Sequence, residues 1–393
     1  MQNWFKKFYS VFVRENNRIL ERKTLYGLTI FLPVILTVIF ILIYINGVVR
    51  DIPVAIFNED NSNLSRLAIR QFAATPSIKI AKYVYSLEEM KEEFRKGNIY
   101  GAIYFPKNLE RDVRKQRQTY VILYRTNANL ITGNTLLRDF TTIAKSLSGK
   151  VLLTKIQKQK GLKEQYAMNI IKPIVIDTDS MFNPQYSYLY FLVPGLLTVS
   201  LYMVILVVTV LLFTSEKDHN TMKDLFDTAE NSISAIIAGK SLPHILLNSV
   251  TAMLTFVITF DLFNVPMRGS LFLILAFSFL FIITCVFLGM AISILSPDQQ
   301  KATEIGLIVS TPAFILSGLT FPVWAMPKIY SYISAIIPYT HYLLGTVKIY
   351  MMGAGLYYLR YEILGLSIVM VISLVVTIVG LNKTKNILRG QNA

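Results

Sequence analysis

The sequence contains a single cysteine, Cys285, which lies inside an apolar run. One thiol cannot form an internal disulfide or supply a cysteine-based zinc site. The three histidines, His219, His244 and His341, are far apart and form no pair of the HExxH kind. We therefore expect no metal site and no disulfide framework.

Charged residues are also scarce. They make up 16% of the 393 residues, against roughly a quarter in an average soluble domain. Apolar residues make up 53%, and the mean hydropathy is +0.48. This composition excludes a disordered chain and argues against an ordinary soluble enzyme.

The charge that is present is unbalanced, with 39 basic and 24 acidic residues and a net charge of +15. In a soluble protein this excess would suggest nucleic-acid binding. Here the apolar content makes membrane lipids the expected partner instead, and we expect no nucleic-acid partner.

Six charge-poor stretches are long enough to cross a bilayer, whose apolar core needs about 20 residues of helix. The first, residues 24–49, is too long and lacks the small-residue cleavage site of a secretory signal, so we interpret it as a retained anchor. We predict a polytopic α-helical membrane protein with six transmembrane helices: Thr24–Val49, a stretch within Met181–Ser215, Ser241–Phe260, Gly269–Pro297, Ile305–Pro322 and Ile363–Asn382.

Lysine and arginine in the short loops indicate the orientation. Thirteen basic residues flank the spans on the side that holds both termini, against four on the other side. We therefore predict cytoplasmic termini in a bacterial plasma (inner) membrane. The segment 50–185 would then lie outside the cytoplasm, and residues 186–393 would form the rest of the membrane domain.

Segment 50–185 has the pattern of a folded mixed α/β domain, because short apolar strands alternate with polar helices. The helix after Ser86 begins with a capping box formed with Glu89. The expected strands are Ile52–Phe57, Ser77–Tyr85, Ile99–Phe105 and Tyr120–Tyr124, and the expected helices are Ser62–Ala74, Ser86–Lys96, Leu109–Gln116 and one from Leu130 to about Met168; Ile174–Ile176 would return the chain to the membrane.

Residues 1–23 predict an amphipathic helix lying on the inner leaflet. Trp4, Phe8 and Phe12 recur at a spacing of four, with Phe5 beside them. Such a helix could be a simple anchor, or a lever that contacts a cytoplasmic partner.

The connector 214–242 joins the second and third predicted spans in the cytoplasm and mixes charged with apolar residues. A short amphipathic helix here could press Met222, Leu225 and Phe226 into a groove on a soluble partner; the alternative is a solvated linker. Residues Ser234–Ser241 nearly fit the phosphate-binding pattern GxxxxGK[ST], but the first glycine and the preceding strand are missing. We therefore expect no nucleotide site in this chain.

Prolines break the segment after the fifth predicted span into short helices. Residues 322–355 contain several tyrosines and few charged residues. This composition favours helices that re-enter the outer leaflet without crossing the membrane. Counting this segment as a seventh span would place the basic C-terminus outside. No acidic residue or histidine lies deep in a span, which disfavours an ion-coupled carrier.

These features together resemble the permease subunits of ABC-2 type transporters, in the subgroup with a large external domain between spans one and two. The breaker-rich segment is similar to the family's "SG–FP–MP–P–T" motif of external re-entrant helices, on Ser317, Gly318, Phe321, Pro322, Pro327 and Pro338. Residues 54–66 and 127–129 look like the subgroup's "DxDxSxLSR" and "xNAN" segments. In the connector, Glu216, Thr221, Leu225, Gly239 and Lys240 align with the family's "E+ExGTLExLLxTP" and "GK", whereas Asn220 and Lys223 depart from it.

The resemblance implies a non-enzymatic permease subunit with no cofactor of its own. ATP would be bound by a partner, a cytoplasmic ABC ATPase, and a second permease copy or paralogue would complete a dimer. Residues Glu216–Phe226 would be the ATPase-coupling helix, and Trp4–Phe12 the connecting helix. Members with this external domain often work with a periplasmic adaptor and an outer-membrane channel.

The implied activity is export of an amphipathic or lipidic substrate from the cytoplasm or inner leaflet. The alternative is a non-transporting receptor or assembly scaffold that acts through the external domain. The breaker-rich external helices and the amphipathic connector favour export, because a scaffold has no need of them.

Overall fold

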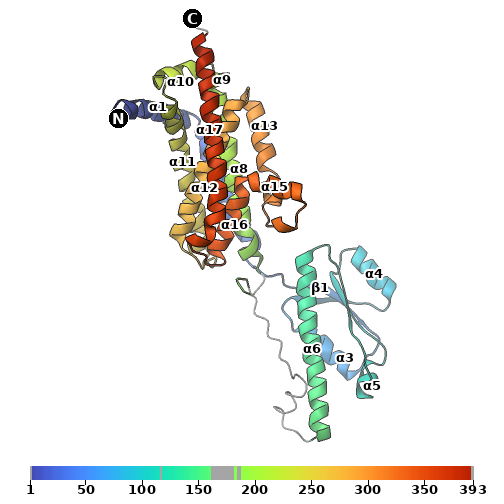
Figure 1. Cartoon of the computed structure of the whole chain (residues 1–393). Helices are drawn as coiled ribbons and strands as arrows, with labels where there is room; N and C mark the ends of the chain where they lie inside the picture. Colours follow the sequence, from blue (N-terminus) through green and yellow to red (C-terminus); the bar gives the residue numbers. More distant parts are fainter. Residues whose placement is uncertain (1, 116, 161–180, 184–186, 391–393) are drawn as a thin grey trace. The chain divides into compact units, whose positions relative to one another are not determined.

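The computed structural model describes residues 2–115, 117–160, 181–183 and 187–390 (Figure 1). The chain divides into two compact units. One comprises Met1–Gly47 with Ser180–Ala393, and the other comprises Val48–Asp179.

The first unit is a bundle of helices. In the described part of the chain, five helical stretches are long and apolar enough to span a membrane. They are α2 (Lys23–Tyr44), α8 with α9 (Tyr188–Thr209 and Leu211–Asp218), α11 with a π-helical end (Ile233–Val257 and Ile258–Leu262), α12 (Leu271–Leu295), and α17 (Arg360–Gly390) with the short 3-10 turn Leu356–Leu359 before it. The prediction of a polytopic helical membrane protein is confirmed to this extent.

The fifth predicted span differs from the others. It forms two helices, α13 (Gln299–Ser310) and α14 (Ala313–Leu316), separated by Thr311 and Pro312. Proline has no N–H to continue the helical hydrogen bonds. The 12 residues of α13 rise about 18 Å, short of the ~30 Å apolar core of a bilayer. The sixth crossing therefore stays a prediction.

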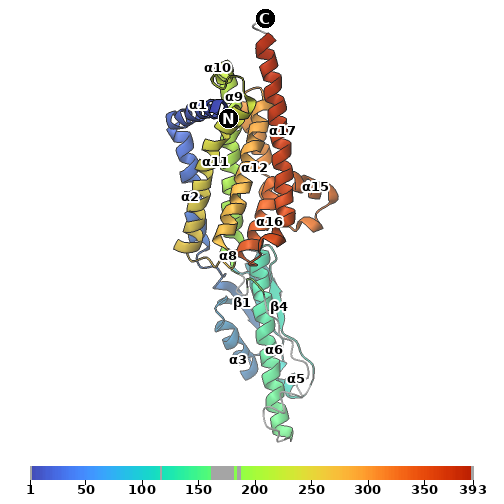
Figure 2. The same ribbon diagram turned by 60° about the vertical axis from the view of Figure 1, so that its left-hand side comes forward.

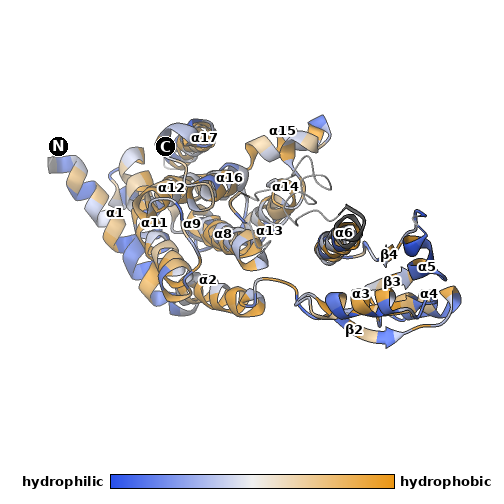
Figure 3. Cartoon of the chain, turned by 90° about the horizontal axis from the view of Figure 1, so that it is seen from below, coloured by the Kyte–Doolittle hydropathy of each residue, from blue (hydrophilic) through white to orange (hydrophobic). Residues whose placement is uncertain are grey.

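Helix α12 lies at the centre of the bundle, where it contacts α8, α11, α16 and α17. Its sequence is apolar on all sides, although part of its surface, including Phe272 and Phe279, is exposed, as expected of a membrane span that faces both other helices and lipid. Gly289 lets α12 approach α8 closely, because a Cβ there would collide with Thr209. The view in Figure 3 shows hydrophobic colour along most of α2 and mixed colour along α1 (Gln2–Glu21).

The breaker-rich segment forms three short helical pieces: a 3-10 turn Val323–Ala325, α15 (Lys328–Ile336) and α16 (Pro338–Tyr350). Gly318 precedes them with φ +93, a conformation that favours glycine. Helix α16 is held in the bundle by its tyrosines. The Tyr339 hydroxyl donates to the Gly195 carbonyl of α8 at 2.8 Å, and Tyr342 shares a 2.7 Å hydrogen bond with Ser278 of α12.

The second unit is built on a four-stranded sheet of order β2-β1-β3-β4. Strand β1 (Ile52–Asn58) pairs in parallel with β2 (Ile78–Tyr83) and β3 (Gly101–Phe105), and β4 (Ile122–Arg125) runs antiparallel to β3. The helices between the strands are α3 (Asn63–Ala73), α4 (Leu87–Arg95) and α5 (Leu109–Arg114), followed by α6 (Leu130–Lys160). Each predicted strand and helix therefore has a counterpart, and residues 161–168 and Ile174–Ile176 lie outside the described residues.

Both faces of this sheet are covered. Val54, Ile56 and Ile103 pack with Phe72 of α3 on one face, and Ala55 packs with α4 residues on the other. Ser86 caps α4 as predicted, accepting from the Glu89 N–H at 3.0 Å. The return bond of the capping box differs, since Glu89 accepts from the Tyr85 N–H instead.

Candidate functional site

One face of α1 carries both the apolar and the charged residues that dock it on the bundle. Val11, Arg14, Glu15 and Arg18 follow the spacing i, i+3, i+4, i+7 and so share one side of the helix. Val11 and Glu15 are almost fully buried. This face lies across α11, with which α1 makes most of its contacts (Figure 2).

The crossing of α1 and α11 depends on Gly239. A Cβ at this position would lie 2.6 Å from Cβ of Val11 and 3.1 Å from the backbone nitrogen of Phe12. Only a residue without a side chain therefore allows the two helices to approach this closely. Near the start of α11, the Trp4 indole N–H donates a hydrogen bond to the Ser234 hydroxyl at 2.9 Å. This bond is a second contact between α1 and α11.

Lys240, the next residue of α11, is completely buried at this crossing. Its ammonium group forms ion pairs with Glu15 of α1 and, at 3.0 Å, with Glu216 of α9. The Phe213 ring centroid lies 6.0 Å from the same nitrogen. A buried cation needs such partners, because its desolvation is otherwise strongly unfavourable.

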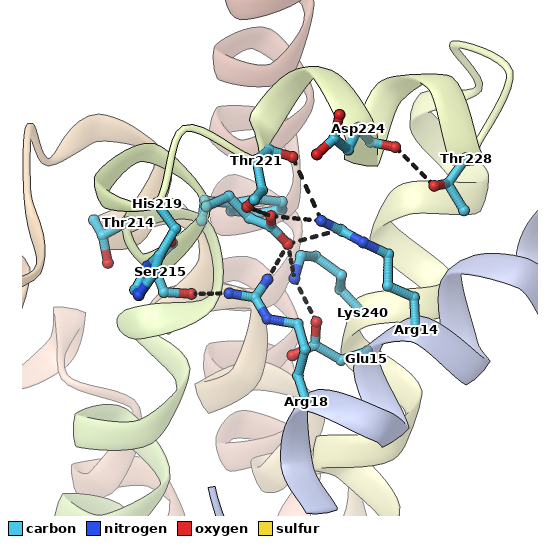
Figure 4. A network of polar contacts seen from close by, with 12 residues as sticks. Arg14, Glu15, Arg18, Thr214, Ser215, His219, Thr221, Asp224, Thr228 and Lys240 are labelled. Carbon is cyan, nitrogen blue, oxygen red and sulfur yellow. Dashed lines mark hydrogen bonds and ion pairs between the residues drawn. The ribbon is translucent and has the colours of Figure 1, made fainter. Parts of the chain in front are cut away.

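Glu216 is the second centre of the cluster, and its partners Arg14, Arg18, Thr221 and Lys240 are labelled in Figure 4. Arg14 binds its two carboxylate oxygens through two guanidinium nitrogens, at 2.8 and 2.9 Å. Arg18 and the Thr221 hydroxyl contact the same carboxylate, and Arg18 also donates to the Ser215 hydroxyl at 2.8 Å. A paired guanidinium–carboxylate contact fixes orientation as well as distance, so α9 cannot turn relative to α1 without breaking it.

Glu15 is enclosed between α1 and α11. Burial alone would raise the pKa of its carboxyl, but the charge of Lys240 and the hydrogen bond to His244 outweigh burial and hold the pKa well below its usual range. The His244 Nε2–Glu15 distance is 3.1 Å, and the Tyr26 ring lies beside the imidazole at 5.5 Å between centroids. The carboxylate therefore stays ionised and keeps the ion pairs of the cluster intact.

The connector 214–242 is shorter than predicted, because α9 and α11 extend into it. Between them stands α10 (Met222–Thr228). The sequence suggested that Met222, Leu225 and Phe226 face a partner protein. Instead all three are buried in the core of their own unit. The exposed face of α10 carries Lys223, Asp224 and Asp227.

The other residues singled out from the sequence lie in two places. On α1, Trp4 and Phe5 are exposed, and their rings stack or tilt against Phe8, which contacts Phe12 in turn. The external motif gathers around α14–α16: Ser317 is buried and donates to the Phe314 carbonyl, Pro338 begins α16, and Phe321, Pro322 and Pro327 flank the exposed 3-10 turn. In Figures 1 and 2 this group lies away from α1 and α10.

Several residues of the cluster were not singled out from the sequence. In the sequence, Arg14 and Arg18 indicate only the orientation of the chain in the membrane, and no motif marks Glu15. Their spacing on one helical face was the available signal. Residues Ser234–Ser241, which resemble a phosphate-binding loop, are helical and place Lys240 in an ion cluster. Among the described residues, no group of three or more His, Cys, Asp or Glu side chains could hold a metal ion.

This arrangement defines a membrane protein whose first helix, α1, is held by buried ion pairs against α11 and against α9 at the end of α8. The chain belongs to the family described as ABC-2 family transporter protein, which it matches over residues 23–381. Subunits of this family are generally the transmembrane component of an ABC transporter, without ATPase activity. Membership therefore implies a separate ATP-binding subunit and often a dimer.

Similar proteins agree with this family. The sequence is 22% identical to "Probable multidrug ABC transporter permease YbhS" of Escherichia coli, over 89% of each chain. It is 24% identical to YbhR of the same organism, over 83% of this chain and 85% of that protein. It is also 24% identical to "ABC transporter G family member 20" of Dictyostelium discoideum, over 90% of this chain but 48% of that protein. The chain is thus an ABC transporter permease, and the bacterial relatives indicate a multi-pass protein of the inner membrane.

Proposed function

We propose that this permease exports an amphipathic or lipidic substrate, driven by a cytoplasmic ATPase that binds beneath α1 and α10. A second copy or a paralogue completes the transport path, and α13 with α14 forms the sixth crossing. Both termini and the charge cluster lie in the cytoplasm, and the α/β unit and α15–α16 lie outside. The multidrug permeases among the relatives and the apolar spans support a substrate of this class.

The observation that carries the proposal is the buried cluster of Glu15, Glu216 and Lys240 with Arg14 and Arg18. It links α1 directly to α9, which continues α8, and to α11. A displacement of α1 or α10 by the ATPase would therefore reach two membrane helices at once, α8 through α9 and α11 directly. In the described part of the chain, α10 follows α9 after the short turn of residues 219–221.

The exposed face of α10 is the expected contact for the ATPase. Asp224 and Asp227 are exposed there, while the apolar residues of the same helix are committed to the core. The two aspartates outnumber the single Lys223 on this face, and a surface with an acidic excess favours a partner surface with basic residues, because complementary charges set association rate and specificity. The coupling contact would then be electrostatic rather than an insertion of apolar side chains.

Reversing this charge tests the assignment. We expect the double variant Asp224→Lys, Asp227→Lys to retain less than a tenth of the co-purifying ATPase, at unchanged permease yield. Asp261→Lys serves as the matched control. Asp261 is exposed at the far end of the membrane stretch that begins with α11, so this variant should retain normal capture. Equal capture by both variants would show that the ATPase does not bind through α10.

The α/β unit is the expected docking point for a periplasmic adaptor, which in turn would reach an outer-membrane channel. Residues 50–185 hold 22 basic and 13 acidic residues, so an acidic partner surface would be complementary. Permease lacking residues 50–185 should lose adaptor capture in a pull-down while keeping its ATPase. Retention of the adaptor by this variant would contradict the docking role.

A further inference from the structure

The α/β unit contains an apolar groove that the transport proposal does not use. It has a volume of about 680 Å³ and runs between α6 on one side and α3 and α5 on the other. Buried side chains of Phe72, Phe105 and Leu109 line it. This volume falls within the usual range of small-molecule pockets, which are mostly apolar with a few polar groups.

The groove continues along α6 into an adjoining cavity of about 320 Å³. The two share the apolar residues Leu64, Val113, Leu147 and Val151. These side chains are only partly buried. Apolar surface left open in this way is unfavourable, so a long apolar occupant would stabilise the unit.

Most polar lining residues of the larger cavity lie in one short segment of the chain. Arg117, Gln118 and Thr119 are consecutive, and Ser148 of α6 lines the same cavity. Among the described lining residues of this cavity, Arg117 carries the charge, and its guanidinium forms no ion pair with a described side chain. The adjoining cavity adds Lys150 and Arg114, the latter paired with Glu110. Basic residues thus outnumber acidic ones along the groove.

From this combination we infer that the groove binds an amphipathic anion, namely an alkyl chain with one anionic head group, as in a membrane-derived fatty acid or lysophospholipid. The chain would lie along Phe72, Leu147 and Val151, and the head group would meet Arg117. The apolar lining and the basic residues are complementary to the two ends of such a molecule. This site is independent of the ATPase contact and of the direction of transport.

The test uses the full-length protein in nanodiscs of zwitterionic lipid and a photoactivatable hexadecanoic acid. We expect saturable labelling, mapped by mass spectrometry to peptides of α3, α5 and α6. Ser148→Trp fills the groove and should lower labelling at least five-fold. Ser146→Trp is the matched control, since Ser146 is also exposed on α6 but does not line either cavity. Equal labelling of the two variants, or labelling that never saturates, would overturn the inference.

A second pair of variants tests the head group. Arg117→Gln should abolish the preference for the acid over the corresponding alkyl alcohol, measured by competition against the photoprobe. Lys115→Gln, exposed two residues away and outside both cavities, should keep that preference. An unchanged preference in Arg117→Gln would exclude Arg117 as the head-group residue. If Ser148→Trp instead removed adaptor capture while labelling stayed normal, the groove would be a protein-docking site and the inference would be wrong.

Discussion

At the scale of single residues, Lys240 holds the cytoplasmic junction together. It is buried, and it pairs with the carboxylates of Glu15 and Glu216, which are more than 200 residues apart in sequence. Buried ion pairs contribute little net stability compared with well-packed apolar residues, but removing one partner leaves an uncompensated charge. The ion pairs of Lys240 therefore fix the positions of α1 and α9, and their effect on stability becomes large when one partner alone is removed.

Replacing this lysine should be costly. Lys240→Met leaves the buried Glu15 without its lysine partner, although Arg14 and Arg18 still pair with Glu216, and we expect a loss of about 3–5 kcal/mol in unfolding free energy. Thermal unfolding of the purified permease would measure it. Lys6→Met, a change at an exposed position of α1, should leave the midpoint unaltered. Similar midpoints for the two variants would show that the cluster does not hold the junction.

The pairing of these charges could not be predicted from the sequence. Arg14 and Glu216 are 202 residues apart, and nothing local to either segment indicates the contact. The glycine–lysine pair of α11 is recognisable as a motif in the sequence. The sequence does not show that Gly239 allows α1 to approach α11, or that Lys240 pairs with Glu15. Similarly, the amphipathic pattern of α10 shows that Leu225 and Phe226 share an apolar face. It does not show whether that face packs against the core of the permease or against a partner protein.

At the scale of elements, the sequence predicts strands and helices better than it predicts interruptions. The alternating pattern of β2 is typical of a strand, and the apolar run of α12, 25 residues long, is too long for one, so the type of each element is predictable. The break between α13 and α14 depends on Pro312, which a count of apolar residues overlooks. The capping serine of α4 was predictable because its signal is local to four residues.

The crossing of α1 and α11 should be sensitive to a single methyl group. Gly239→Ala would push Val11 and the backbone at Phe12 away from α11, and overpacking of this kind costs about 1–3 kcal/mol. Limited proteolysis should then release the N-terminal segment faster. Gly27→Ala in α2, where the nearest atom to a new Cβ is 4.0 Å away, should behave like wild type.

Helix α10 offers a direct distinction between the core and partner roles of its apolar residues. Leu225→Asp buries a charge in the permease core, so we expect a lower unfolding temperature and yield even without the ATPase. Asp224→Leu, on the exposed face, should leave the unfolding temperature of the permease unchanged. A stable Leu225→Asp variant that fails only in ATPase binding would instead support insertion of apolar side chains into the partner.

At the scale of the whole molecule, the overall composition averages two parts of very different charge content. The helical unit consists of nearly charge-free apolar stretches joined by charged ends, whereas residues 50–185 are as charged as a soluble domain. The scarcity of charge in the chain makes the few buried charges informative. Those at the junction of α1, α9 and α11 lie where the proposed ATPase movement would enter the membrane helices.

The central claim is that α1 and α10 move as one body, and a distance measurement between them tests it most directly. Because the chain has one cysteine, spin labels can be placed at Lys6→Cys and at Thr228→Cys, the last residue of α10, after Cys285→Ala. In nanodiscs with the ATPase, we predict the same narrow electron–electron distance without nucleotide and with an ATP analogue, while a label pair on Thr228 and Tyr332 of α15 changes. Lys240→Met should broaden the first distance. A nucleotide-dependent change between Lys6 and Thr228 in the otherwise unaltered chain would contradict the account.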